Sequence, residues 1–301
     1  MRHASQKTRA GFTLVELLVV IAIIGVLMAL GTGASIMALN TVRRKAIKIE
    51  CEGFEQALMM YESEYGELPP DFSDDAAVNR HLYTRFDGKY TGGAAGMQVD
   101  ILDHYEIDIA AFSPADALVF WLGGLPATAP DPGEPYVPAG FNSNDRAPFT
   151  TGGPRTGATY SGFDPERIAW SVYDEAGVAT PSGHLYYMNS APLSTPYVYF
   201  KSRMIGVGTA DAGKGYDPSV QRWMSTDIDG TDLGMVVPYM RSSTVWFNND
   251  GVQVITAGLD GEFSTSPEAL RIVQDATGFS IEDEDNISNF SNATTIGGDT
   301  E

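Results

Sequence analysis

One apolar stretch near the N-terminus limits what this chain can fold into more than any other feature. Residues 12–39 contain a single charged side chain, Glu16, and they follow a leader, residues 1–11, that is basic and has no acidic residue. A helix of that length spans ~42 Å, which exceeds the ~30 Å of a bilayer's hydrocarbon core. It is also longer than the apolar region of a usual secretory signal peptide. The stretch therefore predicts a transmembrane helix over residues 12–39.

The charges in and around this stretch bear on its burial cost and on its orientation in a membrane. A carboxylate such as Glu16 inside a membrane costs roughly 2.5 kcal/mol or more, and a plain anchor gains nothing from that cost. A segment that later lies beside another chain could pair the charge. Basic residues flank the stretch on both sides, so charge counting leaves its orientation open. They are Arg2, Lys7 and Arg9 before it, and Arg43, Arg44, Lys45 and Lys48 after it.

Residues 11–21, Gly-Phe-Thr-Leu-Val-Glu-Leu-Leu-Val-Val-Ile, resemble the signal of type IV pilins and type II secretion pseudopilins. In that family a prepilin peptidase cuts after the glycine on the cytoplasmic side and methylates the new N-terminal phenylalanine. The resemblance implies that Gly11 precedes the cut and that Phe12 is the methylated residue. It implies that Glu16 meets the N-terminus of a neighbouring subunit in a filament. It also orients the chain, with residues 1–11 in the cytoplasm and the globular part outside the inner membrane.

The helix is expected to continue beyond the apolar stretch, over residues 40–66. Six apolar side chains recur there at steps of three and four residues, which is the pattern of an amphipathic helix packed on a core. These are Ile47, Cys51, Phe54, Leu58, Tyr61 and Tyr65. Cys51 on this stripe is expected to be a buried apolar residue rather than a reactive thiol. Gly66 and two prolines then end the helix. Residues 61–70 resemble the end of the long helix in major pseudopilins.

Residues 67–301 are expected to form one globular domain with a long loop insertion at about 71–180. Ser113 and Pro114 predict the start of a short helix that runs to Leu122. The segment 123–165 contains 16 Gly or Pro among its 43 residues, so it is expected to be an irregular surface excursion.

Strands are expected later in the chain, where Val, Tyr, Trp and Thr are frequent. They are residues 184–188, 196–200, 235–240, 244–247 and 252–256. The Asp-Gly pair between the last two predicts that they form an antiparallel hairpin. A second short helix is expected at 266–274, and a frayed tail from Ser288 onward. The predicted fold class is α+β, with a long N-terminal helix packed on a small antiparallel sheet, as in pilins.

Acidic clusters near the C-terminus suggest a metal site. The segments around Asp260 and Asp285 resemble the C-terminal loop of major pseudopilins, which holds calcium through carboxylates and backbone carbonyls. Calcium suits such a loop because it accepts six to eight oxygen ligands in flexible geometry. The resemblance implies Asp260 and Asp285 as ligands, with Asp283 in support. The alternative is a solvated acidic turn, because the gap between Asp260 and Asp285 is longer than is usual in the family. The segment 227–232 is a second acidic turn, best explained by turn chemistry.

The composition excludes some functions. Lys and Arg total 19 against 39 Asp and Glu, a formal charge of −20, which argues against nucleic acid as a partner. No hydrolase elbow, zinc-protease motif or phosphate loop occurs, so no enzymatic activity is expected. The resemblance implies a filament subunit, most like a type II secretion pseudopilin, whose partners are the prepilin peptidase, other subunits, the inner membrane and the secretion machinery. A minor pilin or surface adhesin, and a membrane-anchored periplasmic enzyme, are the alternatives.

Overall fold

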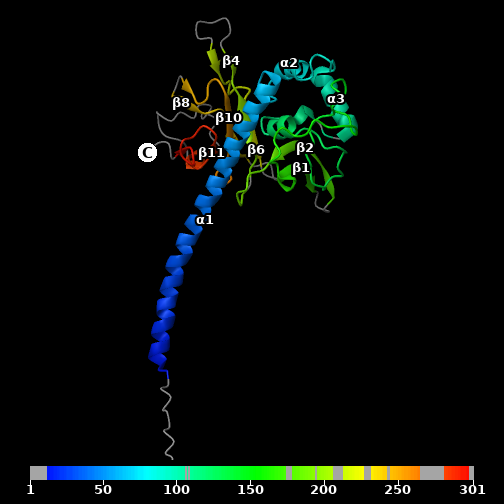
Figure 1. Ribbon diagram of the computed structural model, residues 1–301. Coiled ribbons are helices and arrows are strands. Elements are labelled where there is room, and N and C mark those ends of the chain that lie inside the picture. The colour runs from blue at the N-terminus through cyan, green and yellow to red at the C-terminus, as the bar shows by residue number, and fades with distance from the viewer. Residues whose placement is uncertain are drawn as a thin grey trace, which may run out of the picture. The chain divides into compact units, whose positions relative to one another are not determined.

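The structure is a computed structural model, and its chain divides into two compact units, residues 1–43 and 44–301. One helix, α1 (Leu14–Tyr65), extends from the first unit into the second (Figure 1). The described residues are 12–105, 107, 109–173, 178–193, 195–205, 213–226, 232–242, 245–264 and 281–297. Among these residues, no helix combines the length and the apolar character needed to cross a membrane. The span predicted for residues 12–39 is therefore not confirmed.

The second half of α1 has the predicted amphipathic stripe. Five of its six apolar residues are almost fully buried, and the sixth, Tyr65, is partly buried against the core. The helix ends where the sequence indicates, because Gly66 adopts a φ of +79°, which a glycine reaches without steric cost. Cys51 is buried, and burial raises the pKa of its thiol, so it is an apolar core residue as expected.

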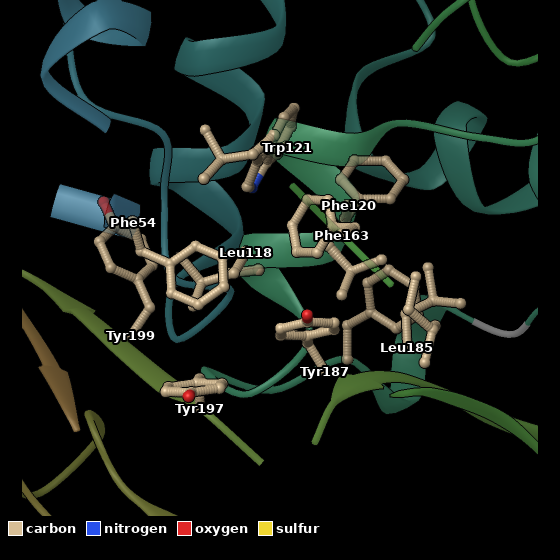
Figure 2. Close-up of a cluster of buried hydrophobic side chains, with 14 of the residues drawn as sticks. Phe54, Leu118, Phe120, Trp121, Phe163, Leu185, Tyr187, Tyr197 and Tyr199 are labelled. Atoms are coloured by element: carbon tan, nitrogen blue, oxygen red, sulfur yellow. The ribbon is translucent and has the colours of Figure 1, made fainter. Parts of the chain in front are cut away.

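Aromatic side chains dominate the core around α1. The Phe54 ring lies 4.9 Å from that of Tyr160 and 5.1 Å from that of Tyr197, measured between ring centroids. Figure 2 shows Phe54 facing rings that come from distant parts of the chain, among them Phe163 and Tyr187. Such pairs add about 0.5–1.5 kcal/mol each beyond the area they bury. Ring packing along one face thus holds the second half of the helix against the rest of the unit 44–301.

Two helices occur inside the insertion, where only loops were predicted. They are α2 (Asp75–Arg85) and α3 (Gly93–Tyr105). The Asp74 carboxylate caps the first of them by accepting a hydrogen bond of 2.9 Å from the backbone N–H of Ala76. This cap was a readable signal in the sequence, because Asp is a favoured N-cap residue and Asp75 in the first turn suits the helix dipole. The prediction of a loop over this part of the insertion was wrong.

The Gly- and Pro-rich segment 123–165 is irregular, as predicted, but it is not a surface excursion. Four of its large side chains are at most 2% exposed, namely Leu125, Tyr136, Phe141 and Phe149. Its glycines let backbones approach closely, since a Cβ on Gly124 would stand 2.5 Å from Gly140. The aromatic side chains pack in the core, so the irregular chain that carries them is buried with them. The 3₁₀ turn η1 (Ile109–Ala111) and the π-helix η2 (Val119–Gly123) precede this segment, and the 3₁₀ turn η3 (Pro165–Arg167) follows it.

The strands of the described residues form five small sheets, all antiparallel. Four are two-stranded: β1 (Ile168–Tyr173) with β2 (Ala179–Tyr187), β4 (Arg203–Ile205) with β5 (Gly213–Gly215), β6 (Trp223–Thr226) with β7 (Asp232–Val236), and β8 (Met240–Ser242) with β9 (Val245–Trp246). The fifth has the order β11 (Ile287–Ser288), β10 (Val252–Thr256), β3 (Val198–Lys201). The class is α+β with small antiparallel sheets, which is consistent with a pilin-like fold.

The predicted hairpin between residues 244–247 and 252–256 is wrong. A turn does form, with the backbone N–H of Gly251 donating to Asn248 O at 2.9 Å. However, β9 pairs with β8, and β10 pairs with β3 and β11. The Gln253 side chain bridges the gap, because its amide bonds both backbone groups of Tyr239 and the carbonyl of Phe247. Hydrogen bonds from the Gln253 side chain therefore take the place of the backbone hydrogen bonds that the Asp-Gly turn predicts between the two strands.

Candidate functional site

The N-terminal site begins with Phe12, whose side chain is 73% exposed. Gly11 and the rest of the leader lie outside the described residues. The next residues bond each other reciprocally: the Glu16 carboxylate accepts hydrogen bonds of 2.8 Å from both the backbone N–H and the hydroxyl of Thr13. In return, the Glu16 backbone N–H donates to the Thr13 hydroxyl at 3.2 Å. This arrangement is a capping box, which satisfies donors at the first turn of a helix.

The capping box gives Glu16 a position as well as a charge. Its carboxylate lies beside the backbone N–H of Thr13, one residue from the amino group that a cut after Gly11 would create. Thr13 was not singled out in the sequence, although the spacing Thr-x-x-Glu before an apolar run is a known sign of a helix start. The carboxylate therefore caps the first turn of α1 within the single chain.

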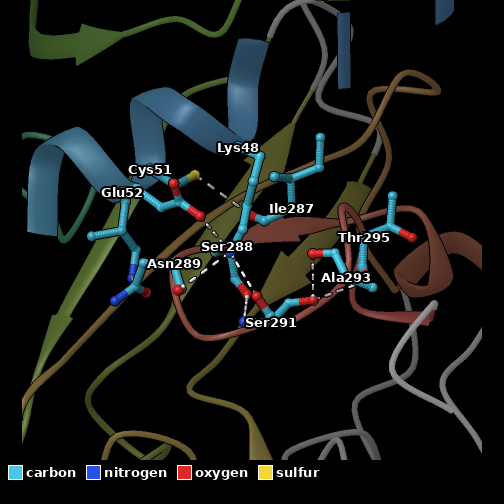
Figure 3. Close-up of polar contacts among 10 residues, drawn as sticks. Lys48, Cys51, Glu52, Ile287, Ser288, Asn289, Ser291, Ala293 and Thr295 are labelled. Atoms are coloured by element: carbon cyan, nitrogen blue, oxygen red, sulfur yellow. Dashed lines mark hydrogen bonds and ion pairs between the residues drawn. The ribbon is translucent and has the colours of Figure 1, made fainter. Parts of the chain in front are cut away.

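A second candidate site is the C-terminal segment, residues 285–291, which lies along α1. Lys48 is its main tether: the ammonium group donates hydrogen bonds of 2.7 Å to Ser288 O and Ser291 O, and one of 3.3 Å to Asn289 O (Figure 3). The Lys48 side chain is only 12% exposed. One lysine therefore holds the short backbone stretch 288–291 against the helix through three carbonyl oxygens.

The segment that Lys48 holds is not the frayed tail that the sequence predicted. Ser288, Ser291 and Ile296 are at most 4% exposed. Asn289 explains part of this order, because its side chain bonds the backbone of both Val252 and Val254 in β10. Polar composition alone suggested a frayed end, but these polar groups are used in hydrogen bonds to buried backbone.

A third contact ties α1 to the turn η3 and to the residue just before β3. The Glu50 carboxylate accepts two hydrogen bonds from the Arg167 guanidinium, at 2.5 and 2.8 Å, and one from the hydroxyl of Tyr197. The guanidinium also lies over the Tyr187 ring, 4.5 Å from its centroid. Bidentate pairs of this kind are among the stronger charged contacts in proteins. Sequence reasoning did not identify this pair, because its partners are more than a hundred positions apart.

The structure places Asp260 and Asp285 next to each other. Burial, together with the charge and the side-chain hydrogen bond of Asp285, raises the pKa of Asp260 to about 6. A hydrogen bond between two carboxyl groups requires a proton on one of them, because ionised carboxylates only accept. The Asp285 Oδ2 atom accepts a bond of 2.9 Å from the backbone N–H of Leu259, while its buried Oδ1 has no donor among the described residues.

The fit of this pair to calcium is partial. An orphaned carboxylate oxygen beside a second carboxylate is a donor set that a hard cation would complete. Gly258 leaves the room that Asp285 needs, because a Cβ there would lie 2.1–2.2 Å from the carboxylate atoms. No group of three or more His, Cys, Asp or Glu side chains that could hold a metal occurs among the described residues. Backbone carbonyls and water would therefore have to supply the other ligands.

Asp283, the third predicted ligand, has a different environment. It is buried, and its Oδ1 accepts hydrogen bonds from the Tyr239 hydroxyl, the Asn286 amide and the backbone N–H of Ser264. These bonds tie Asp283 to three neighbouring segments, and its part in binding calcium stays a prediction. The acidic turn at 227–231 and the helix predicted at 266–274 lie outside the described residues.

Comparison with known proteins adds one finding to this geometry. Residues 6–32 match the family model described as the prokaryotic N-terminal methylation motif. The chain carries the methylation motif of type IV pilins and pseudopilins. No curated protein and no solved structure matches the chain. The motif includes the Thr13–Glu16 capping box, so the pilin-type processing signal and the start of α1 are the same residues.

Proposed function

We propose that this chain is a structural subunit of a pilin-like filament, most like a type II secretion pseudopilin that acts in protein export across the outer membrane. The observation that carries the proposal is the methylation motif at the head of a 52-residue helix. Large apolar side chains are exposed on the described parts of the first unit's helix, such as Leu17, Ile21 and Met37, at 55–74%. A surface of this kind is covered in a working protein, here by lipid and then by other subunits.

The proposed path begins at the inner membrane, with the leader in the cytoplasm. The prepilin peptidase cuts after Gly11 and methylates Phe12, and the apolar half of α1 later packs among other subunits. In that low-dielectric bundle Glu16 pairs with the N-terminus of a neighbour, which removes the cost of burying its charge. The chain itself does no chemistry, and the work of export comes from the machinery around it.

Two variants separate the charge of Glu16 from its capping role. We expect Glu16→Val to be cleaved and inserted normally but to fail in filament assembly, measured in sheared fractions. Thr13→Ala removes the partner of the cap and keeps the carboxylate, so it is expected to assemble. Normal assembly of Glu16→Val would contradict the pairing role. Failure of both variants would assign the defect to the loss of the helix cap.

A deletion strain distinguishes the export role from its alternative. Loss of protein secretion with normal attachment supports a pseudopilin, whereas loss of attachment or motility supports a minor pilin or adhesin. One observation favours the second reading: the insertion is folded and joins the main hydrophobic core through aromatic rings, among which those of Phe86, Tyr90 and Phe149 lie within 6.1 Å of one another. A rigid insertion of this kind could present a binding surface.

The proposal includes a calcium ion at the C-terminal loop, held by Asp260 and Asp285. The ion would offset the repulsion between the two carboxylates, as a proton on Asp260 does without calcium. Calcium is then expected to raise the melting temperature of the full chain in detergent, since a ligand at 100 times its Kd stabilises by about 2.7 kcal/mol. Asp260→Ala and Asp285→Ala should each abolish the rise, and the exposed Asp103→Ala should not. Equal melting with calcium and with chelator would leave only a solvated acidic turn.

A further inference from the structure

Arg44 lies beside the predicted calcium ligand and is only loosely bound to it. Its Nη2 atom is 3.8 Å from Asp285 Oδ2, too far for a hydrogen bond. Arg44 Nε and Asp285 Oδ1 are both buried, and neither has a hydrogen-bond partner among the described residues. The ion pair therefore leaves a donor on one side and an acceptor on the other unused, although each is costly to bury alone.

The next cation along the same face of α1 behaves differently. Lys48 follows Arg44 by one helical turn, and its ammonium is fixed by three carbonyl oxygens, two of them at 2.7 Å. Both cations face the C-terminal segment, but only Lys48 is locked there. Arg44 forms an ion pair with Asp285 but no hydrogen bond, so its guanidinium can move away without breaking a hydrogen bond to Asp285.

We propose that Arg44 is a built-in competitor for the divalent cation at Asp260 and Asp285, an inference that rests on the calcium site proposed above. Two carboxylates and one guanidinium carry a net charge of −1. A dication added to them makes the net charge +1 and places two cations against one carboxylate, where they repel each other. Cation binding at the loop thus displaces the Arg44 guanidinium, and the position of Arg44 in turn sets the affinity of the loop for the cation.

The coupling has a consequence for the chain as a whole. Arg44 is the first residue of the unit 44–301, directly after the helical segment that carries the apolar side chains. A cation at the C-terminal loop therefore changes which charge is available at the beginning of the globular unit.

Calcium titration by calorimetry, on the full chain in detergent, tests this competition. We expect Arg44→Gln to bind calcium about tenfold more tightly than the unaltered chain, and high salt to narrow that difference because it screens the repulsion. Arg44→Lys keeps the charge and is expected to stay within about threefold. Lys45→Gln, an exposed cation one position along, is the matched control and should leave the affinity unchanged.

The outcomes separate the competition by Arg44 from the calcium site itself. Equal or weaker binding by Arg44→Gln, in a protein with the near-ultraviolet dichroism of the unaltered chain, would overturn the competition and leave the calcium site standing. Binding by none of the variants, nor by the unaltered chain, would overturn the site and the competition together. If Arg44→Gln does not fold, Arg44→Met, which keeps the apolar stem, takes its place in the same titration.

Discussion

Lys48 offers the sharpest test of how the C-terminal segment is held. In Lys48→Met the apolar stem remains, but the ammonium and its three hydrogen bonds to carbonyl oxygens are lost. The residues that carry those carbonyls are at most 8% exposed, so water does not replace the lost donor easily. A hydrogen bond to a charged group is worth about 1.5–3 kcal/mol, and one of the three here is long. We expect a loss of about 3–5 kcal/mol in the free energy of unfolding.

The assay is thermal unfolding of the full chain in detergent, followed by near-ultraviolet dichroism of the aromatic core. For a unit of this size 1 kcal/mol corresponds to about 2–4 °C, so Lys48→Met should melt about 10 °C lower. Lys45→Met is the matched control, because Lys45 is exposed on the same helix and its loss should cost no more than about 0.5 kcal/mol. Equal melting of the two variants would refute the tether.

Three further changes test other contacts. Asp260 has a pKa of about 6 in the folded chain against an ordinary value of 3.8, so without calcium the free energy of unfolding should fall by about 1–2 kcal/mol, after solvent screening, as pH rises from about 4 to 6. Asp260→Asn should remove this pH dependence when unfolding is measured across the same range. Gly258→Ala should place a methyl group against the Asp285 carboxylate and lower the melting temperature with or without calcium, and a neutral result would show that the loop has room to move. Arg167→Met should cost about 2–4 kcal/mol in denaturant unfolding because it leaves Glu50 without its bidentate partner, whereas a loss below 1 kcal/mol would show that this pair adds little.

The elements that the sequence predicted well are those with a local signal. The stripe from Ile47 to Tyr61 repeats at helical spacing, and that spacing alone decides which face is buried. The strand at 252–256 was predicted with its exact bounds, since a short run of Val, Ile and Thr after a turn is enough to indicate it. Gly66 marked the end of α1 for an equally local reason, its positive φ.

The errors share another cause, which is dependence on distant partners. Glycine and proline correctly excluded regular structure at 123–165, but they could not show that Tyr136 and Phe149 enter the core. The Asp-Gly turn was real, yet β3 competed successfully for β10, and Gln253 filled the space that a hairpin would have used. Composition and turn chemistry describe a segment by itself, and burial depends on what the rest of the chain brings to it.

The candidate sites also divide into those with a local sequence signal and those that depend on distant partners. Phe12 and Glu16 were identified because their signal is continuous in sequence, and the capping partner Thr13 could have been read from the same motif. Lys48 and Arg44 were noted only as charges after the apolar stretch, since no pattern on α1 indicates carbonyls or a carboxylate from beyond residue 280. The pairing of Asp260 with Asp285 came from a family resemblance, and its role in binding calcium stays a prediction.

The central claim, that this is a pilin-type subunit, is tested most directly by mass spectrometry of the mature N-terminus. The protein is isolated from membranes of cells that contain a prepilin peptidase, and the N-terminal peptide is sequenced and weighed. We expect a chain that begins at Phe12 with one added methyl group on its amino nitrogen. A chain that still begins at Met1, or one cut after about residue 38, would contradict it.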